Sequence, residues 1–475
     1  MTPIARRIAR WVAEQSYDQI PESTVHEVKR RVIDTLGVAI GAYTAPPCRI
    51  ARAVAESTHD THAGTVWGTT HSSRPGLVAF ANGTMVRYLD FNDAYISAEC
   101  AHPSDNIPAA VAVAQSAGLG GKEAILGMVI AYEIQCRLCD AGALRLAGWD
   151  HVIYAALSTA MAAGKLWGLD EDGLVQALQM AGVCNIATRQ TRRGHISVWH
   201  ACAAGNASRN GVFAADLARR GLDGPNEIFE GSRGLMNQLC IPDVERLKLA
   251  ESGHYRVSRC HIKAWPAGTF AQPAIDAILQ LRPQIELEQV ESIQIDTCEA
   301  AEAVMASEPQ KWRPASRETA ANSLPYCCAV ALADGDVTPD SFAEERLTDP
   351  QMFDLMDKVK VAEDPELNRR FPEGIPARAT IAMVGGRKVE QRVDYPRGHI
   401  RNPMSDDELV AKFRRLADGM ITDETAERIL AAAWRLEELT ELRDLFEFGM
   451  IHPDANAAAM RPRALPKKLV KTDDA

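Results

Sequence analysis

The stretch HVIYAALSTAMAAGKLWG (151–168) decides the fold class, because it is long enough for a helix and apolar on nearly every side. KEAILGMVIAYEIQCRL (122–138) has the same character. A helix that is apolar all round must be buried between other elements. Both stretches are rich in small side chains, which let neighbouring helices approach closely. They therefore predict a large domain of packed helices.

The helical pattern continues on both sides of these stretches. VHEVKRRVIDTLGVAIGAY (25–43) places apolar residues at three- and four-residue steps. IPAAVAVAQSAG (107–118) follows a proline and a serine that suit a helix start. ACAAGNASRNGVFAADLARRG (201–221) has a similar alanine-rich pattern. Near the other end of the chain, SDDELVAKFRRLAD (405–418) opens with a Ser-x-x-Glu capping box and again predicts a helix.

A different pattern separates these two helical regions. VESIQIDT (290–297) alternates apolar and polar residues as a strand does, and ARATIAMVGGRKVEQRVDY (377–395) predicts a hairpin around two glycines. We therefore predict a mainly α protein, with a large all-helical domain made from both chain ends and a smaller α+β domain. The predicted limits are 1–261 and 399–455 for the helical domain, 262–398 for the α+β domain, and 456–475 for a disordered tail.

The composition excludes several classes of function. The 475 residues carry a net charge of −11, whereas a nucleic-acid-binding surface needs a basic excess. No uncharged apolar run reaches the length of a membrane span, and the first residues are charged throughout, unlike a signal peptide. The 11 cysteines have no regular spacing. We therefore expect a reduced, cytoplasmic protein that binds neither nucleic acid nor a membrane.

Several short polar motifs lie between the apolar segments of the chain. The first is YLDFNDAYISAECAHPSDN (88–106). Asp90, Asp93 and His102 lie within it among aromatic residues. Three interpretations are open for such a stretch: a solvated loop with capping residues, a metal site, or one wall of an active site. Further polar motifs are WDHVIY (149–154), TRQTRRGHISVWHACAAGNASRNGVFAA (188–215), CHIKAWPAGTFAQ (260–272), SLPY (323–326) and YPRGHIRNP (395–403).

A metal ion is one candidate ligand of these motifs. Asp90, Asp93, His102 and His151 could together bind Mg²⁺ or Zn²⁺. No His-x-x-x-His motif or carboxylate cluster supports such a site, and the single CxxC motif, at 136–139, lies in a predicted helix without a second pair. We therefore predict no metal site.

In their order along the chain, the polar motifs resemble those of the MmgE/PrpD family. The seven matching blocks are LDFND…HPSDN, DHVIYAALSTAMAAGKLWGL, the TR–GHISVW–ASRNGVFAA block, GP…FEG, K-x-x-P, SLPY and YPRGHIRNP. They lie in a resemblance that runs from residue 4 to about residue 450, and such an ordered set is a specific signal. The resemblance implies a large helical domain with a smaller α+β domain, a homodimer, and neither an organic cofactor nor an essential metal.

The resemblance also implies where the active site lies. Members of the family have a pocket between the two domains, and its polar residues correspond here to Asp90, His102, His151, Lys263 and Tyr326. We expect His102 and His151 to transfer protons, without assigning which of them is the base. Asp90 would fix the tautomer of a histidine or raise its basicity. Lys263 would hold a substrate carboxylate together with nearby arginines, for which Arg192 and Arg193 are the candidates.

Several positions depart from the family pattern. His200 stands where many relatives have lysine, and Ala94 where they have threonine or serine, so we predict an altered substrate-binding role at both positions. Gly268 and Phe270 replace a Glu-x-His pair, and Ala-Asn ending at Asn322 replaces Asp-His. These changes favour a substrate with fewer carboxylates, or with a bulkier apolar part, than a tricarboxylate.

The resulting hypothesis is a lyase that acts without a cofactor on a small (poly)carboxylic acid, by removing a proton next to a carboxylate. The resemblance favours a 2-methylcitrate dehydratase-like hydro-lyase with an altered substrate. Decarboxylation or epimerisation of a dicarboxylate is an alternative, because each makes the same first demand on the site. A non-catalytic carboxylate-binding homologue is a further alternative, because polar positions have been lost.

Overall fold

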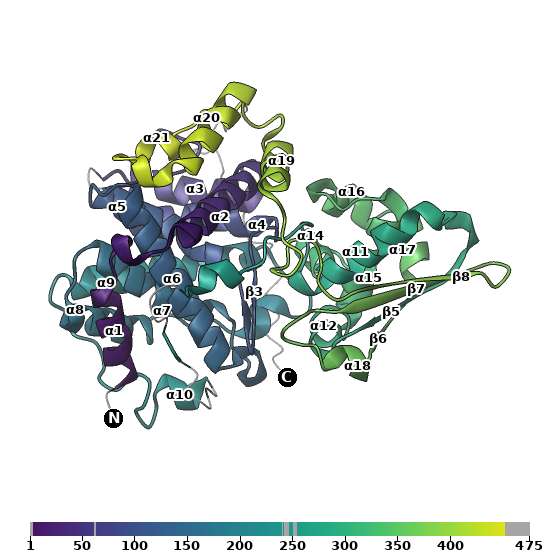
Figure 1. Ribbon diagram of the computed structural model, residues 1–475, viewed down its shortest axis with the longest axis horizontal. Coiled ribbons are helices and arrows are strands. Elements are labelled where there is room, and N and C mark those ends of the chain that lie inside the picture. Colours follow the sequence, from purple (N-terminus) through teal and green to yellow (C-terminus); the bar gives the residue numbers. More distant parts are fainter. Residues whose placement is uncertain (1–2, 61–62, 240, 242–246, 250–253, 452–475) are drawn as a thin grey trace, which may run out of the picture.

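The chain forms two lobes, each with its own hydrophobic core (Figure 1). The computed structural model describes residues 3–60, 63–239, 241, 247–249 and 254–451, so the predicted tail at 456–475 lies outside the described residues. One core is built from residues between 4 and 262 together with residues between 404 and 450, and we call this part the large lobe. The other core is built from residues between 267 and 393, which form the small lobe.

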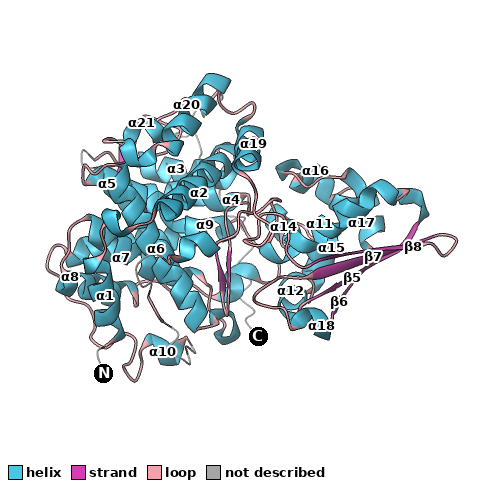
Figure 2. Cartoon of the chain, viewed as in Figure 1, coloured by secondary structure: helices cyan, strands magenta, loops and turns pink. Residues whose placement is uncertain are grey.

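The large lobe consists of helices drawn from both ends of the chain, as predicted (Figure 2). Its C-terminal helices lie against α2, so the two ends of the sequence share one core (Figure 1). The helices are α1 (Ile4–Glu14), α2 (Glu22–Gly41), α3 (Pro46–Glu56), α4 (Pro75–Tyr88), α5 (Ile107–Ser116), α6 (Gly121–Ala141), α7 (Val152–Leu166), α8 (Glu171–Ala181), α9 (Trp199–Ala218), α10 (Leu235–Gln238), α19 (Asp406–Ala417), α20 (Asp423–Trp434) and α21 (Arg443–Phe446).

Helix α7 confirms the prediction from the opening stretch, because every residue of it except Lys165 is buried. It packs between α6 and α9, and α9 in turn packs on α4. The contact between α4 and α9 depends on two glycines. A Cβ atom on Gly83 would lie 2.9 Å from the Cα of Gly205, so no side chain fits at that contact. This close approach holds the C-terminal end of α4 against the helix that carries His200.

The small lobe contains a four-stranded mixed sheet of order β6-β5-β7-β8. Strand β5 is parallel to β6 and antiparallel to β7, and β7 pairs with β8 as the predicted hairpin. The hairpin turn includes Gly385 and Gly386, whose φ angles of 88° and 83° suit glycine. The strands are β5 (Val290–Thr297), β6 (Val359–Glu363), β7 (Ala377–Met383) and β8 (Lys388–Val393).

Helices pack around this sheet and complete the small lobe (Figure 1). The apolar face of α11 contacts β7 and β8, and α15 contacts β6. The helices are α11 (Gln272–Leu281), α12 (Glu299–Met305), α13 (Pro309–Trp312), α14 (Arg317–Ala321), α15 (Leu324–Asp334), α16 (Glu344–Leu347), α17 (Pro350–Met356) and α18 (Pro365–Asn368). The fold is therefore mainly α with a small mixed sheet, as the sequence predicted, and we retain 262–398 as the proposed limits of the α+β domain.

The large lobe also contains two short β-hairpins. Strands β1 (Gly64–Thr65) and β2 (Ser72–Ser73) form one, and β3 (Tyr95–Ile96) and β4 (Cys100–Ala101) form the other. The second hairpin lies inside the polar stretch 88–106 and therefore shapes the wall that this stretch forms. None of the helices in the described part of the chain combines the length and the apolar character that a membrane crossing requires.

Candidate active site

The polar stretch 88–106 begins where α4 ends, and Asp90 is the first of its predicted site residues. Asp90 has a φ angle of 50°, a left-handed conformation that aspartate adopts more readily than most residues. Its carboxylate accepts hydrogen bonds from Arg87 Nη1 (2.7 Å), Lys263 Nζ (2.6 Å) and Asn322 Nδ2 (3.2 Å). Burial alone would raise the pKa of Asp90, but the cations of Arg87 and Lys263 hold that pKa well below its usual value.

Lys263 is the partner that joins Asp90 to the junction of the lobes. Its Nζ also donates to the Asp90 carbonyl at 2.8 Å, so it holds both the side chain and the backbone of that residue. Burial lowers the pKa of Lys263 to about 8, although the Asp90 carboxylate opposes this shift. The lysine therefore keeps its charge at neutral pH and loses it under mildly alkaline conditions.

His102 lies on the same wall with a defined tautomer. Its Nδ1 is 2.7 Å from the carbonyl oxygen of Asp93, which can only accept, so Nδ1 carries the proton and Nε2 has a free lone pair. The Asp93 carboxylate is itself fixed by the Ser104 backbone N–H at 2.9 Å and the Tyr132 hydroxyl at 2.7 Å. Burial lowers the pKa of His102 well below its usual value, so its imidazole is uncharged.

His151 faces His102 from the start of α7. The two ring centroids are 5.3 Å apart with an angle of 62° between the planes. Burial, followed by the neighbouring Arg192 cation, lowers the pKa of His151 well below its usual value. The ring makes no capping hydrogen bond to α7, and its buried Nδ1 has no hydrogen-bond partner among the described residues. Structural capping therefore does not explain His151.

Asp150 and Arg192 lie next to His151 and form an ion pair with each other. Asp150 Oδ1 lies 3.7 Å from His151 Nε2, and Arg192 Nε lies 2.9 Å from Asp150 Oδ2. The backbone holds these segments together, because Asp150 N–H donates to the Ala187 carbonyl at 2.9 Å and Arg189 N–H donates to the Gly148 carbonyl at 2.9 Å. The arginine-rich segment after residue 187 is thereby fixed beside the start of α7.

These groups converge on a cavity of about 70 Å³ at the junction of the two lobes. The large lobe supplies the cationic and titratable part of the wall, and the small lobe supplies a mostly apolar part. The lining residues are Arg87, Asp90, Glu99, Cys100, His102, Arg145, His151, Arg189, Arg192 and His200 from the large lobe, and Gly268, Thr269, Phe270, Val304, Met305 and Asn322 from the small lobe. The wall can therefore hold an anionic group at one end and an apolar group at the other.

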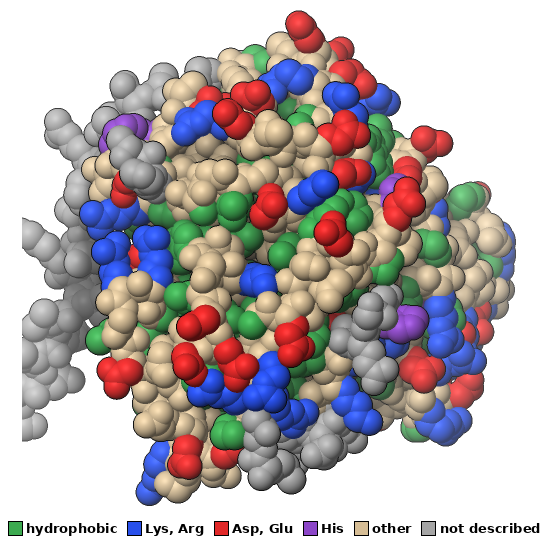
Figure 3. Space-filling model, turned by 60° about the vertical axis from the view of Figure 1, so that its left-hand side comes forward, with side chains coloured by type: hydrophobic (Ala, Val, Ile, Leu, Met, Phe, Trp, Pro, Cys, Tyr) green, Lys and Arg blue, Asp and Glu red, His purple; other side chains and the backbone are tan. Residues whose placement is uncertain are grey.

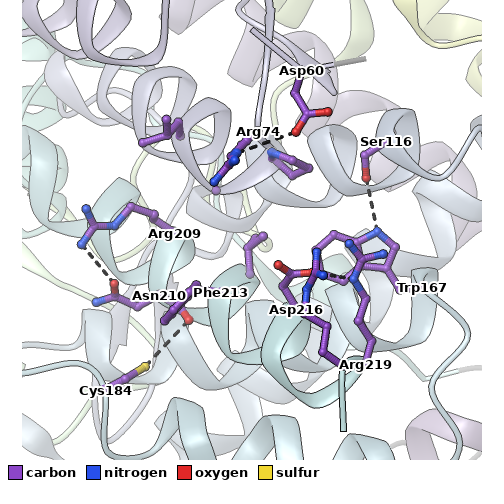
Figure 4. Close-up of a pocket in the computed structure, with 15 residues that line it drawn as sticks. Asp60, Arg74, Ser116, Trp167, Cys184, Arg209, Asn210, Phe213, Asp216 and Arg219 are labelled. Atoms are coloured by element: carbon purple, nitrogen blue, oxygen red, sulfur yellow. Dashed lines mark hydrogen bonds and ion pairs between the residues drawn. The ribbon is translucent and has the colours of Figure 1, made fainter. Parts of the chain in front are cut away.

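A larger hollow of about 810 Å³ lies elsewhere on the large lobe, and its chemistry is different (Figure 4). It is bordered by α9 and by the start of α4, with Arg209, Phe213 and Asp216 along its α9 side. Of its described lining residues, none is a histidine or a lysine. The cavity at the lobe junction is smaller, but it holds the two facing histidines, His102 and His151, and we therefore take it as the candidate active site.

Profile models of the MmgE/PrpD N-terminal domain and the MmgE/PrpD C-terminal domain match residues 6–247 and 265–438. The chain belongs to the MmgE/PrpD family. Among curated family members, the mitochondrial 2-methylcitrate dehydratase of Yarrowia lipolytica is 28% identical over 459 residues, which cover 91% of this chain and 88% of the relative. The 2-methylcitrate dehydratase of Cupriavidus necator is 28% identical, over 85% of this chain and 87% of the relative. The cis-aconitate decarboxylase of Mus musculus is 26% identical, over 89% of this chain and 88% of the relative.

Most of the positions at which this MmgE/PrpD chain departs from the family pattern line the cavity. His200, Gly268, Phe270 and Asn322 are in its wall. Burial lowers the pKa of His200 well below its usual value, so this position, where the resemblance led us to expect a lysine, carries no charge. Ala94 is not in the wall, because its backbone pairs with that of His261 in an isolated bridge.

Two further predicted residues lie away from the cavity. Tyr326 is fully buried in the core of the small lobe, and its hydroxyl donates to the Ser341 carbonyl at 2.8 Å. Arg193 points instead to Glu308, with 3.2 Å between Nε and Oε1. Neither side chain lines the cavity, so neither has a place in the chemistry proposed below. The predicted role of Asp90 also changes, since the carbonyl of Asp93, and not the Asp90 carboxylate, fixes the tautomer of His102.

The sequence interpretation missed several residues of the site. Arg87 is the most prominent, because it is buried and pairs with Asp90 three positions away in sequence. The sequence did contain a signal for Arg87, namely a charged residue near the end of the otherwise mostly apolar helix α4. Arg145 and Glu99 had no such signal, since Arg145 lies in the single short turn Leu144–Ala147 and Glu99 in the loop between β3 and β4, whose positions depend on the tertiary fold.

Lys412 of α19 was also missed, although it supports the site from the C-terminal part of the chain. Its Nζ lies 2.6 Å from Asp34 Oδ1 and donates to the carbonyls of Phe91 and Lys263, each at 2.9 Å. Those two carbonyls belong to residues that flank or contact Asp90. Lys412 therefore fixes the backbone on both sides of the Asp90–Lys263 pair.

The described residues form no cluster of three or more His, Cys, Asp or Glu side chains that could hold a metal ion. Asp90 and Asp93 each have other partners, as given above, and His102 uses Nδ1 for the Asp93 carbonyl. On the outer surface, acidic and basic side chains are interspersed over the face seen in Figure 3.

Proposed function

We propose that this chain is a lyase that acts without a cofactor on a small carboxylic acid. Its proposed reaction is the reversible dehydration of a hydroxy acid, as in a 2-methylcitrate dehydratase but with an altered substrate. The observation that carries this proposal is the pair of buried, uncharged histidines, His102 and His151, which face one cavity with ring centroids 5.3 Å apart. An uncharged imidazole beside bound carboxylate is suited to proton transfer near neutral pH.

His102 is the better base of the two. Its Nδ1–H is used by the Asp93 carbonyl, so Nε2 is free to accept a proton from the substrate carbon next to a carboxylate. Negative charge then develops on that carboxylate. Arg87 in the cavity wall, with Lys263 behind it on Asp90, stabilises this charge because both cations are fixed before the substrate arrives.

His151 is placed to supply the second proton. A bound carboxylate adds negative charge to the cavity and favours the imidazolium form of His151, which the neighbouring Asp150 also favours. As the C–H electron pair becomes the carbon–carbon double bond, the C–O bond breaks. The hydroxyl then leaves as water with the proton of His151, while His102 retains the proton taken from carbon.

Decarboxylation is the second candidate, and the similarity to cis-aconitate decarboxylases favours it. In that reaction the bond to a carboxylate carbon breaks, CO₂ leaves, and the resulting carbanion takes a proton from an imidazolium.

Epimerisation would use the two facing histidines as base and acid on opposite sides of one carbon. A purely binding role is less well supported, because both histidines and the arginines converge on one cavity.

The altered substrate follows from the cavity wall. His200 has no charge at neutral pH, and Phe270, Val304 and Met305 give the small-lobe side an apolar surface. A tricarboxylate needs several cations, and two of the four arginines in this wall are already paired, with Asp90 and Asp150, so the wall suits a molecule with fewer carboxylates and an apolar substituent.

Substrate profiling tests the proposed function. The purified protein is dialysed against EDTA and incubated with 2-methylcitrate, citrate, cis-aconitate and smaller hydroxy acids, while ultraviolet absorbance of the new double bond and CO₂ release are recorded. Rising absorbance from a hydroxy acid supports the hydro-lyase. Release of CO₂ without hydroxy-acid turnover would assign the decarboxylase instead, and loss of activity with EDTA would contradict the metal-free mechanism.

We further propose that the enzyme is a cytoplasmic homodimer, on the basis of the family resemblance. Light scattering coupled to gel filtration tests the dimer. A molar mass of one chain at micromolar concentration would contradict it.

A further inference from the structure

The four arginines that line the cavity differ in their partners, and this difference points to a binding role. Arg87 and Arg192 are held in ion pairs with Asp90 and Asp150, with closest distances of 2.7 Å and 2.9 Å. Arg87 and Arg192 are therefore partly neutralised before a ligand binds.

Arg145 and Arg189 have no such carboxylate partner. The Arg145 side chain donates to the uncharged carbonyl of Ala98 at 2.6 Å. Among the described residues, the Arg189 side chain has no hydrogen-bond acceptor and no ion-pair partner within 4.0 Å, and it feels the charges of Glu99 and Asp150 only from beyond that distance. Burial lowers the pKa of Arg189, which reflects the cost of holding this unpaired guanidinium in the protein. Such a group is stabilised if an anion fills the cavity beside it.

Glu99 lies in the same part of the wall and interacts electrostatically with both arginines, but it forms no ion pair within 4.0 Å with either of them among the described residues. Its buried carboxylate accepts backbone N–H groups instead, from Arg145 at 2.7 Å and Cys100 at 3.2 Å. Burial raises the pKa of Glu99, and the Arg145 backbone N–H and the cations of Arg189 and Arg145 oppose that shift. Two guanidinium groups and one carboxylate line this end of the cavity, so it carries a positive excess.

The backbone fixes both arginines in place. Arg189 begins the short helical turn Arg189–Arg192, and its N–H donates to the Gly148 carbonyl at 2.9 Å. Arg145 lies in the turn Leu144–Ala147, which the hydrogen bond to Glu99 ties to the β3–β4 hairpin. A pair of cations on anchored segments can bind a carboxylate with little loss of conformational entropy.

We propose that Arg189 and Arg145 form the subsite for a second, non-reacting carboxylate of the substrate. This inference rests on the proposed function and deepens it. The reacting carboxylate lies toward Arg87 and the two histidines, the second carboxylate lies against Arg189 and Arg145, and the apolar substituent faces Phe270 and Met305. Arg189 is thus a specificity-determining residue that distinguishes a dicarboxylate from a monocarboxylate.

Direct binding measurements test this subsite separately from catalysis. Isothermal titration calorimetry compares malonate, succinate and glutarate with their monoamides, in which one carboxylate is replaced by a neutral group of nearly the same size. The expected result for the wild-type protein is that the best dicarboxylate binds at least about tenfold more tightly than its monoamide, as a charge-assisted contact of roughly 1.5–3 kcal/mol would give.

Three variants complete the test. Arg189→Gln is expected to lose most of this preference, Arg189→Lys to keep part of it, and the exposed control Arg414→Gln to keep all of it. Thermal melting verifies that each variant is folded. An Arg189→Gln protein that retains the full preference would overturn the subsite, as would equal loss of affinity for both ligands, or a wild-type protein that binds none of the dicarboxylates. Selective binding without any turnover would support the subsite and reject the lyase.

Discussion

Lys263 Nζ lies 2.6 Å from Asp90 Oδ1 although the two residues are 173 positions apart in sequence, and both side chains are buried. Arg87 binds the same oxygen at 2.7 Å, so one carboxylate balances two cations. The pair joins the wall formed by the stretch 88–106 to the segment that leads into the small lobe. Its charge balance therefore determines both the stability of the lobe junction and the field in the cavity.

Neutralising Asp90 is expected to destabilise the protein. Asp90→Asn keeps the shape of the side chain but leaves Arg87 and Lys263 buried without a counter-charge, which costs about 3–5 kcal/mol. Denaturant-induced unfolding measures the loss. Arg414→Gln, which removes an exposed pair with Glu427, serves as the control and should cost about 1 kcal/mol or less. Equal effects of the two changes would contradict the structural importance of the Asp90 pair.

His102→Asn is expected to reduce kcat about 10²–10⁴-fold on the substrate identified by profiling, because a general base is removed. The asparagine amide can still donate to the Asp93 carbonyl, so the local fold is retained. Incorporation of deuterium from D₂O at the substrate carbon, followed by NMR, should fall in parallel. The exposed His254→Asn is the control. Normal deuterium incorporation in the His102→Asn variant would show that another residue acts as the base.

The stability of the protein is expected to fall as the pH drops below about 6.5, the usual pKa of histidine. Burial lowers the pKa values of His102, His151 and His200 well below that point. In this range the unfolded chain therefore binds protons that the folded chain does not. Each such histidine removes about 1.4 kcal/mol per pH unit until the pH reaches its folded pKa.

Urea unfolding at pH 7.5, 6.5 and 5.5 measures this dependence. His200→Gln should reduce the slope of the free energy of unfolding against pH by the contribution of one buried histidine. His254→Gln should leave that slope unchanged. A free energy of unfolding that is constant from pH 7.5 to 5.5 would show that the buried histidines gain protons in the folded state as easily as in the unfolded one.

Activity is expected to fall above about pH 8, because burial lowers the pKa of Lys263 to about 8 and the site then loses a cation. The pH profile of kcat/KM measures this alkaline limb. Lys263→Arg should move the limb to higher pH, since arginine keeps its charge throughout this range, even if its larger side chain lowers the maximum rate. An alkaline limb at the same pH in both proteins would assign the titration to another group.

Lys412→Met is expected to lower both stability and kcat. The change leaves Asp34 unpaired in the core and releases the carbonyls of Phe91 and Lys263, with a cost of about 3–5 kcal/mol. Adding Asp34→Asn should recover much of the stability, because the orphaned charge is removed, but not kcat, because the two carbonyls remain free. Recovery of both quantities in the double variant would mean that Lys412 does not position the site.

The fold was largely accessible from sequence because its signals are local. The uninterrupted apolar character of α7, the alternation in β5 and the two glycines of the β7–β8 hairpin each reflect the period of one element, and each was found where predicted. The candidate site was only partly accessible. His102 and His151 stand out as polar residues at the ends of apolar segments, whereas Arg145 lies in the short turn Leu144–Ala147, which has no such pattern.

The helical lobe, the smaller α+β lobe and the resemblance to the MmgE/PrpD family were all predicted from the residues along the chain. The tertiary fold sets the contacts that the polar motifs make. It brings the Tyr326 hydroxyl to the Ser341 carbonyl in the small-lobe core, and it brings the Asp93 carbonyl to His102, whose tautomer that carbonyl sets. It also leaves Arg189 without an ion-pair partner within 4.0 Å among the described residues. The physical reason is that periodicity depends on neighbours in sequence. Charge pairing, hydrogen bonding and pKa depend on distances of a few ångströms between residues that folding brings together.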